Sequence, residues 1–502
     1  MSLLAACNSS AESAAADAAL AQSLLEQRRI AEARLAINRA IAEQDSEADY
    51  HLLLAQIELT AGSTEGAFVA FSDALSLDGT NGAAMAGVAQ TGLEIGRLDE
   101  SKAAAERILT FDSTNVDALT ILGLIEYLRR RYRPSLGYAE QILEIDPANE
   151  GGAILATRAL FKRGEVVEAR NRLTTFEKLG GITSGSARTR LEVARHDNDA
   201  AAMEAAFADL ARLMPGDLAI AIDRADFLFK RGRRDLAMDE VETALVHKEA
   251  SAAQIATTLG IVAEYAAADL LARRAPQILP AAAPATRIAM ARLFVDSGQY
   301  AAAAEALEGD RGNDAAALRA LALLRQGQVE QAGTLARAVV AADEDHCDAL
   351  IVSAQISLRG GRPQDAVRMG QRAAAQCPEL VEGWAVTARA HAAKDDIINA
   401  RRVFRDGVAA LPQSTLMARR YADWLLAQGA EREAVATARR LTRKAPALLS
   451  GWALYETVCR KAADGCAAEA AKGLAEARVR YGVDPRPGER QAYNLFGRFE
   501  RE

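Results

Sequence analysis

Aromatic residues, cysteines and long apolar runs are all scarce in this chain of 502 residues. Aromatics make up 5% of the sequence, although half of all residues are hydrophobic and alanine is the commonest of them. This composition favours closely packed helices over β-sheets or large aromatic-lined pockets. No run of about 18 apolar residues occurs, so the sequence predicts no transmembrane helix.

An excess of basic charge is also absent. The formal net charge is −8, which argues against a chain whose whole surface binds nucleic acid or an anionic membrane. The chain is longer than the roughly 250–300 residues at which a single hydrophobic core stops growing. We therefore expect it to divide into domains or to repeat.

The motifs that mark common catalytic and metal sites are missing. There is no phosphate-binding Gly-x4-Gly-Lys-Ser/Thr, no His-Glu-x2-His, no Gly-x-Ser-x-Gly and no Cys-x2-Cys. The glycine-rich stretch 180–185 follows no expected strand and is interpreted as a loop. The sequence predicts no enzyme, no metal site and no cofactor.

What the sequence does contain is an internal repeat. Seven glycines are each followed, five residues later, by an alanine: Gly62/Ala67, Gly164/Ala169, Gly232/Ala237, Gly298/Ala303, Gly327/Ala332, Gly361/Ala366 and Gly429/Ala434. Around them the chain falls into blocks of about 34 residues, which run without a break over 14–251 and again over 313–482. Within 48–81 the apolar residues recur at steps of three, four and seven, so each block predicts two helices around a glycine turn.

The block ends carry turn and capping residues. Examples are Asp146-Pro147-Ala148-Asn149 and Met214-Pro215-Gly216-Asp217, in which proline cannot continue a helix and Asn or Asp can cap the next one. A block of this length cannot bury enough surface alone, so neighbouring blocks must stack.

These blocks resemble tetratricopeptide repeats, whose pattern places Trp, Gly or Ala, an aromatic residue and Pro at fixed positions. The tryptophan survives only as Trp384 and Trp452, and Ser101, Ser135 and Met203 replace the small residue of the second helix. The resemblance implies an all-α, right-handed superhelical solenoid of antiparallel helix pairs, with about 12–14 repeats. A generic helical solenoid of longer period is the alternative.

The repeat register divides the chain into five segments. Residues 1–13 form an N-terminal segment and linker, 14–251 and 284–482 form two repeat arrays, and 483–502 form a tail expected to cap the last repeat. Residues 252–283 lose the register, and Pro276, Pro280 and Pro284 interrupt any continuous helix there. We interpret this stretch as one degenerate repeat with a short second helix; a hinge between two arrays is the alternative.

Leu4-Ala5-Ala6-Cys7 has the form of a bacterial lipobox, and a short polar spacer follows it. It resembles a lipoprotein processing site, in which Cys7 becomes the lipidated N-terminus. A signal peptide also needs a charged region and 7–15 apolar residues, for which Met1-Ser2-Leu3 is too short. We therefore expect that segment to be encoded upstream of Met1; chance occurrence in an alanine-rich chain is the alternative.

The other four cysteines fall into two pairs. Cys347 and Cys377 are expected at adjoining ends of one helix pair, and Cys459 and Cys466 flank a turn. Each pair could reach the Cα separation of a disulfide, which persists in an oxidising periplasm but not in a cytosol. The alternative is buried free thiols that pack as small apolar residues.

In the family that the repeats resemble, the first helices line a concave face, so partner binding is expected there. The matching positions of blocks 150–251 give a basic strip with two aromatic residues: Arg158, Phe161, Lys162, Arg188, Arg195, His196, Phe229 and Lys230. This basic strip suits an acidic or carboxylate-ended peptide, or else an anionic polysaccharide, because Arg offers paired donors to carboxylates. A solvated charged face with packing phenylalanines is the alternative.

The function expected from the sequence is a non-catalytic protein-interaction scaffold. The lipobox and cysteines favour a periplasmic, outer-membrane lipid-anchored protein that assists assembly of a cell-envelope complex, of polysaccharide-export, pilus or secretion type. Its partners would be proteins, not nucleic acid, with membrane contact only through a processed Cys7. The alternative is a cytosolic adaptor or co-chaperone without an anchor.

Overall fold

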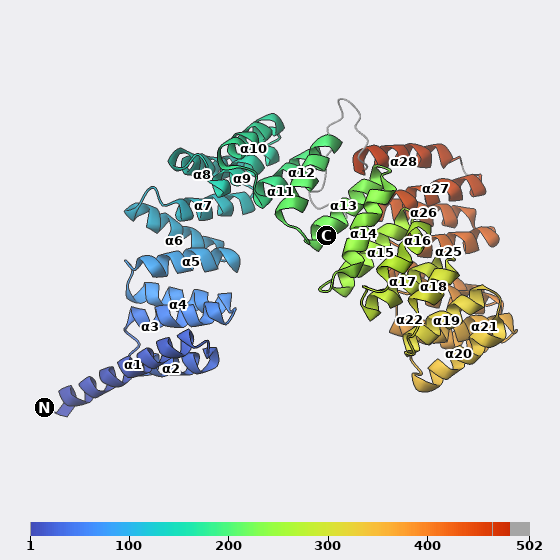
Figure 1. Ribbon diagram of the computed structural model, residues 1–502, viewed down its shortest axis with the longest axis horizontal. Coiled ribbons are helices and arrows are strands. Elements are labelled where there is room, and N and C mark those ends of the chain that lie inside the picture. The colour runs from blue at the N-terminus through green and yellow to red at the C-terminus, as the bar shows by residue number, and fades with distance from the viewer. Residues whose placement is uncertain (1, 464, 482–502) are drawn as a thin grey trace. The chain divides into compact units, whose positions relative to one another are not determined.

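The computed structural model describes residues 2–463 and 465–481, and within them every regular element is a helix (Figure 1). Side chains are described for 11–463 and 465–478. The predicted tail 483–502 therefore lies outside the described residues. The predicted all-helical fold is confirmed, and the described residues form 28 helices.

Consecutive helices pair along the chain, and their bounds follow the predicted blocks. They are α1 (Ser2–Glu26), α2 (Ile30–Glu43), α3 (Ala48–Thr60), α4 (Thr64–Leu77), α5 (Gly82–Glu94), α6 (Leu98–Phe111), α7 (Val116–Leu128), α8 (Tyr132–Ile145), α9 (Glu150–Lys162), α10 (Val166–Gly180), α11 (Ser184–His196), α12 (Ala200–Leu213), α13 (Leu218–Lys230), α14 (Arg234–Val246), α15 (Ala252–Glu264), α16 (Ala268–Ile278), α17 (Pro284–Asp296), α18 (Tyr300–Ala306), α19 (Asn313–Arg325), α20 (Val329–Ala342), α21 (Cys347–Arg359), α22 (Pro363–Gln376), α23 (Val381–Ala392), α24 (Ile397–Ala410), α25 (Thr415–Ala427), α26 (Glu431–Lys444), α27 (Leu449–Ala462) and α28 (Ala467–Tyr481).

The glycine and alanine of each block have distinct roles. All seven glycines of the repeat signature have a positive φ, between 69° and 84°, where a side chain would be strained. All seven alanines five residues later have no exposed surface, so they lie at the closest approach of two helices. At the same place in other repeats, the buried hydroxyls of Ser101 and Ser135 donate to the carbonyls of Ala89 and Gly123 in the preceding helix.

Side-chain caps start many of the first helices. The side chain of Asn149 accepts a hydrogen bond from the Gly152 N–H at the start of α9, and Asp217 caps α13 in the same way. These are residues that the block-end sequences mark as caps. Such caps fix where each repeat begins and so keep the inner helices in register.

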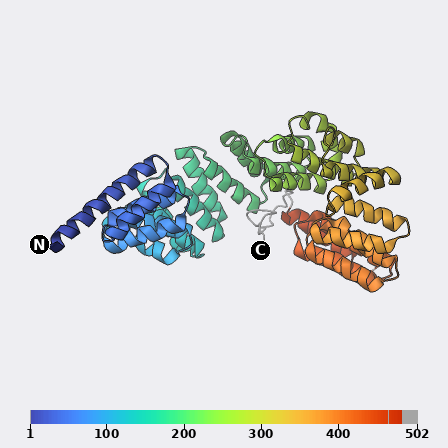
Figure 2. The same cartoon turned by 90° about the horizontal axis from the view of Figure 1, so that it is seen from below.

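The chain forms two compact units, residues 1–193 and 194–502. In both units, first helices of successive repeats contact one another, as α5 contacts α7 in the first unit and α19 contacts α21 in the second. Figure 2 shows the second unit turning back on itself, with the orange and red helices below the green and yellow ones. The first helices thus form an inner layer in each unit.

The irregular stretch predicted at 252–283 is a helix pair with a short second member, α16, which ends at Ile278 after Pro276. The next second helix, α18, is shorter still, at 7 residues. Arg287 and Arg319 donate to the backbone carbonyls at and just beyond its end, among them those of Ala306 and Asp310. In this stretch the second helices α14, α16 and α18 also contact one another in sequence.

Candidate functional site

The basic strip predicted at 158–230 is divided between the two units. Arg158, Phe161, Lys162 and Arg188 belong to the first unit, and Arg195, His196, Phe229 and Lys230 belong to the second. Whether these residues bind a partner stays a prediction. Their local surroundings are described one unit at a time.

In the first unit, Arg158 of α9 is paired with an acid. Its Nε lies 3.2 Å from the carboxylate of Glu192 on α11. Burial raises the pKa of Glu192, and the nearby charges of Arg158 and Lys162 oppose that rise. Tyr127 of α7 is also affected by the charges of Glu192 and Arg158, and burial raises the pKa of its hydroxyl to about 12. Phe161 is buried within the helical packing, whereas Lys162 and Arg188 are exposed.

The second-unit members of the strip have partners as well. Arg195 forms an ion pair with Asp223 and lies over the ring of Phe207. Lys230 lies 2.8 Å from Asp226, one turn earlier on α13. The ring of Phe229 is buried and stacks on Tyr265 with centroids 5.1 Å apart. Both phenylalanines of the strip therefore contribute to packing between helices.

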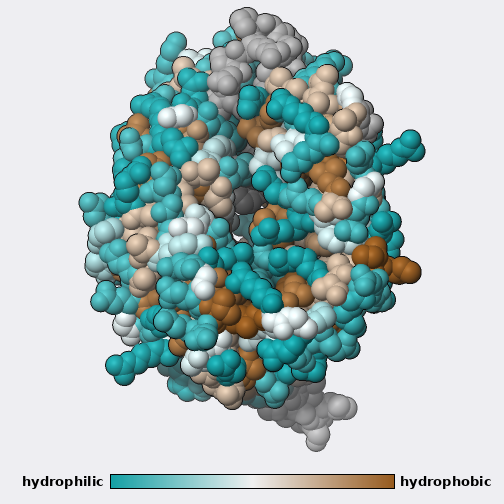
Figure 3. Space-filling view, turned by 90° about the vertical axis from the view of Figure 1, so that its right-hand side faces the viewer, coloured by the Kyte–Doolittle hydropathy of each residue, from teal (hydrophilic) through white to brown (hydrophobic). Residues whose placement is uncertain are grey.

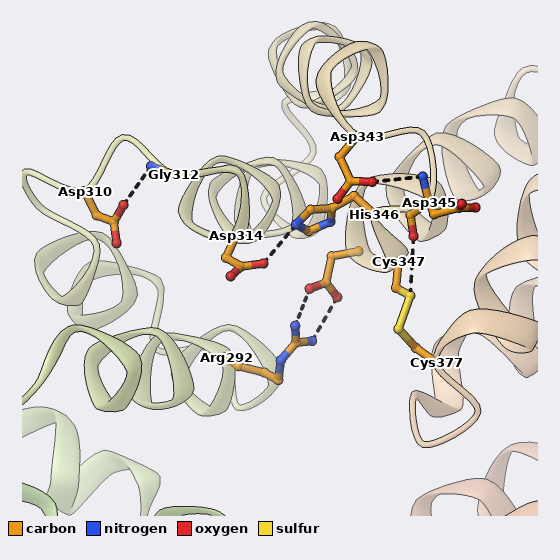
Figure 4. A network of polar contacts seen from close by, with 10 residues as sticks. Arg292, Asp310, Gly312, Asp314, Asp343, Asp345, His346, Cys347 and Cys377 are labelled. Carbon is orange, nitrogen blue, oxygen red and sulfur yellow. Dashed lines mark hydrogen bonds and ion pairs between the residues drawn. A yellow bond between two sulfur atoms is a disulfide. The ribbon is translucent and has the colours of Figure 1, made fainter. Parts of the chain in front are cut away.

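A second charged region lies further along, on the inner layer of the second unit. Its first part is the ion pair of Arg292 on α17 with Asp348 on α21, in which one nitrogen–oxygen distance is 2.9 Å (Figure 4). Asp348 is 5% exposed, so this pair is largely withdrawn from solvent. The pair joins first helices two repeats apart, past α19, which indicates strong curvature of this inner layer.

The same crossing occurs one repeat later around Glu382, on α23. Its carboxylate lies 3.6 Å from Arg325 of α19, 3.7 Å from Arg389 of its own helix and 2.5 Å from Arg420 of α25. Arg359 of α21 donates to the backbone carbonyl of Leu324, and its charge acts on Arg389. We call Arg325, Arg359, Arg389 and Arg420, with Glu382, the arginine cluster.

The electrostatics of the arginine cluster are unbalanced. Partial loss of hydration against the packed helices lowers the pKa of Arg389, although about half of its side-chain surface (49%) stays exposed. The like charges of Arg420, Arg325 and Arg359 lower the pKa further, while Glu382 acts in the opposite sense. Asp296 at the end of α17 is the next acid, and burial raises its pKa despite Arg292 and Arg325 nearby. The cluster thus gathers more positive charge than its own acid neutralises.

Sequence reasoning missed this cluster, although a signal for it was present. Applied to blocks 313–346, 347–380 and 381–414, the positions used for the basic strip give Arg325, Arg359, Glu382 and Arg389. Arg420 lies outside those positions, and it reaches Glu382 because α25 packs beside α23.

The four candidate cysteines lie in pairs. The structure joins Cys347, at the start of α21, to Cys377, which follows α22, with Cα atoms 6.3 Å apart (Figure 4). It joins Cys459 to Cys466 across the turn between α27 and α28, with Cα atoms 5.4 Å apart. Cys7 lies in α1, among residues whose side chains are outside the described part.

The described residues show few features of a metal site, a membrane-spanning helix or an apolar docking surface. Among the described side chains, no three or more His, Cys, Asp or Glu residues are placed to hold a metal ion. No described helix combines the length and apolar character needed to cross a bilayer. The face in Figure 3 is mostly hydrophilic, with small, separate apolar groups. In the first unit, a hollow of about 570 Å³ lies against α5, α6 and α7, where Phe111 is exposed.

Solved structures similar to this chain are other helical-repeat proteins, at low similarity. One, from a functional characterization of Pseudomonas aeruginosa pilF, is 22% identical, covers 42% of this chain and 96% of its own, and has a TM-score of 0.33. PilW, titled a widely conserved type IV pilus biogenesis factor, is 16% identical over 40% of this chain and 94% of its own, with a TM-score of 0.34. A tetratricopeptide repeat protein from Parabacteroides merdae is 15% identical over 62% and 99%, with a TM-score of 0.34.

No curated protein sequence matches the chain. The sequence model of the tetratricopeptide repeat matches residues 18–84 and 317–380, one stretch in each unit. Both stretches have the helix pairs, glycine turns and buried alanines described above. The chain therefore contains tetratricopeptide repeats in both units.

Proposed function

We propose that this protein is a non-catalytic protein-interaction scaffold, exported to the periplasm and held at the outer membrane by lipid on Cys7. There it would assist the assembly of a cell-envelope complex of pilus, secretion or polysaccharide-export type. The repeats supply the scaffold, because stacked helix pairs present an extended inner layer of side chains on which a partner segment can lie.

The observation that carries the export proposal is the distribution of the five cysteines. Four of them form the two disulfides of the second unit, and the fifth is Cys7 of the lipobox-like sequence. Disulfides persist in oxidising compartments such as the bacterial periplasm and are rare in a cytosol. A lipidated thiol and two disulfides would account for every cysteine in the chain.

The test is metabolic labelling of the gene product, expressed with its genomic upstream sequence, by a palmitate analogue. We expect the parent to be labelled and to sediment with outer membranes, and the Cys7→Ala variant to lose both properties. A Cys377→Ala variant is the control for loss of any cysteine and should keep the label. The partner would then be sought by affinity purification from intact membranes.

An unlabelled protein in the soluble cytosolic fraction, with all of its thiols open to alkylation before reduction, would contradict the proposal. That result would favour the cytosolic adaptor instead.

The basic strip has its own test, since replacing Arg158, Arg188 and Arg195 with Glu should weaken capture of the partner. Equal recovery with the variant and the parent would remove the strip from the binding surface.

A further inference from the structure

The arginine cluster has more donors than acceptors. Arg325, Arg389 and Arg420 lie around the single carboxylate of Glu382, and only Arg420 approaches it at hydrogen-bond distance. The charge of Arg359 acts on Arg389 and is the fourth of the cluster. Arg389 reaches it only at 3.7 Å, and Arg359 donates instead to a backbone carbonyl, at 3.4 Å. Arg325, Arg359, Arg389 and Arg420 are all exposed, so a ligand from solvent can reach them.

A buried amide beside the cluster is the second, independent observation. Gln355 is 6% exposed, and its Nε2 has no hydrogen-bond partner among the described residues. It lies one turn before Arg359 on α21, so the two side chains share a helix face. It also holds the same place in its repeat as Arg389 holds on α23, which contacts α21. A buried donor without an acceptor is costly, and a ligand oxygen would satisfy it.

We propose that the arginine cluster and Gln355 bind carboxylates of an acidic segment of a partner protein, laid along the inner layer of α19, α21, α23 and α25. This inference rests on the proposed scaffold function and names the chemistry of one of its partners. It places that partner at residues 325–420, apart from the basic strip.

The choice of carboxylate follows from the cluster itself. Glu382 shows that a carboxylate fits between Arg325 and Arg420, and guanidinium groups match the planar geometry of that group. Packed helices lie about 8–10 Å apart, so the four first helices span roughly 25–30 Å. An extended peptide of about eight residues covers that length, and an acidic one can present a carboxylate to each helix.

The probe is fluorescein-labelled octaglutamate, titrated with the full chain by fluorescence anisotropy, with octaglutamine as the uncharged comparison. Low salt is used, because exposed charges are screened over about 10 Å at 0.1 M. We expect octaglutamate to bind and octaglutamine not to bind. The double variant Arg359→Gln/Arg389→Gln should lose at least tenfold in affinity, and Gln355→Met should lose severalfold. Glu382→Gln should tighten binding, because it removes the competing internal carboxylate.

Two matched controls separate this site from general charge. Arg212→Gln removes an exposed arginine of the second helix α12, and Arg368→Gln removes an exposed arginine of the second helix α22. Both should bind octaglutamate within about twofold of the parent, with unchanged circular dichroism in every variant.

Parent-like affinity in Arg359→Gln/Arg389→Gln would overturn the proposal, as would an equal or larger loss in either control. Binding of polygalacturonate but not of octaglutamate would also overturn it, in favour of a polysaccharide ligand. The result is independent of the export proposal, because the titration needs no lipid on Cys7. Failed palmitate labelling with intact octaglutamate binding would reject only the compartment.

Discussion

The basic strip at 158–230 and the arginine cluster at 325–420 are built largely from the same repeat positions, yet they balance their charge differently. In the strip, Arg158, Arg195 and Lys230 each have an acid from their own or a neighbouring first helix. In the cluster, Arg325, Arg389 and Arg420 share Glu382, and Arg359 adds a fourth positive charge. A basic sequence pattern therefore marks a surface without telling whether its charge is already neutralised.

The origin of the difference is the spacing of the partners. The strip pairs Arg158 with Glu192, 34 residues later and therefore in the next repeat. In the cluster, Arg325 meets Glu382 two repeats away, as Arg292 meets Asp348. Ion pairs between helices two repeats apart bring charged side chains from several repeats to one place. The net charge at that place therefore cannot be found by counting acids and bases within a single repeat.

A covalent link is the second difference, and removing it gives the largest expected effect. Cys347–Cys377 closes a stretch of 30 residues around α21, which carries Gln355 and Arg359, whereas the strip contains no cysteine. By loop entropy the bond contributes up to about 3–4 kcal/mol. We expect Cys347→Ala/Cys377→Ala to raise hydrogen exchange in α21 and α22 and to leave α9 and α13 unchanged.

The second disulfide is the control for that prediction. Cys459–Cys466 closes only 7 residues, and the same reasoning gives about 2 kcal/mol for it. Its removal should raise exchange in α27 and α28 alone. Equal exchange in α21 and α22 with and without the first bond would show that packing, rather than the link, holds the cluster's helices.

The next effect tests whether both regions share one repeat geometry. Ala237 lies in the strip repeat 218–251 and Ala332 in the cluster repeat 313–346, and neither has exposed surface. Leucine at either site would overpack the contact between two helices and cost about 1–3 kcal/mol, lowering the urea midpoint. Ala338→Leu, on the exposed face of α20, is the matched control and should change the midpoint little. An unchanged midpoint in both buried variants would contradict the register.

The repeat geometry is the part that the sequence predicts well. The five-residue spacing from Gly62 to Ala67 recurs because each repeat needs a left-handed turn followed by a close contact between two helices. Glycine suits the turn and alanine suits the contact, so both can be recognised from the local sequence. Asn149 and Asp217 were predictable caps for the same reason. The repeat positions point to Arg325, Arg359, Glu382 and Arg389, but the contact between Arg325 and Glu382 was not predictable, since it depends on curvature built up over two repeats. Phe161 and Phe229 occupy positions expected on the inner face, yet their side chains are buried between helices. The position of a residue within its repeat does not show whether its side chain packs against a helix or faces a partner.

The smallest expected effect concerns Asp296, the acid beside the cluster. Partial loss of hydration raises its pKa above the ordinary value of 3.8, although the residue still reaches solvent. Asp348 and Glu382 act in the same sense, and Arg292 and Arg325 oppose them. The folded chain therefore holds this proton more tightly than the unfolded chain does. The stabilisation from protonation is complete below about pH 3.8 and is lost as the pH rises through the folded pKa.

An asparagine side chain at position 296 would have no proton to lose. We expect the urea midpoint of Asp296→Asn to exceed that of the parent at pH 7.5 and the two midpoints to converge as the pH falls toward 4. Glu330→Gln, an exposed acid on α20, is the control and should follow the parent at every pH. A constant offset between Asp296→Asn and the parent would mean that Arg292 and Arg325 cancel the effect of lost hydration on the pKa of Asp296. The cluster would then already be neutralised like the strip, and its need for an external carboxylate would disappear.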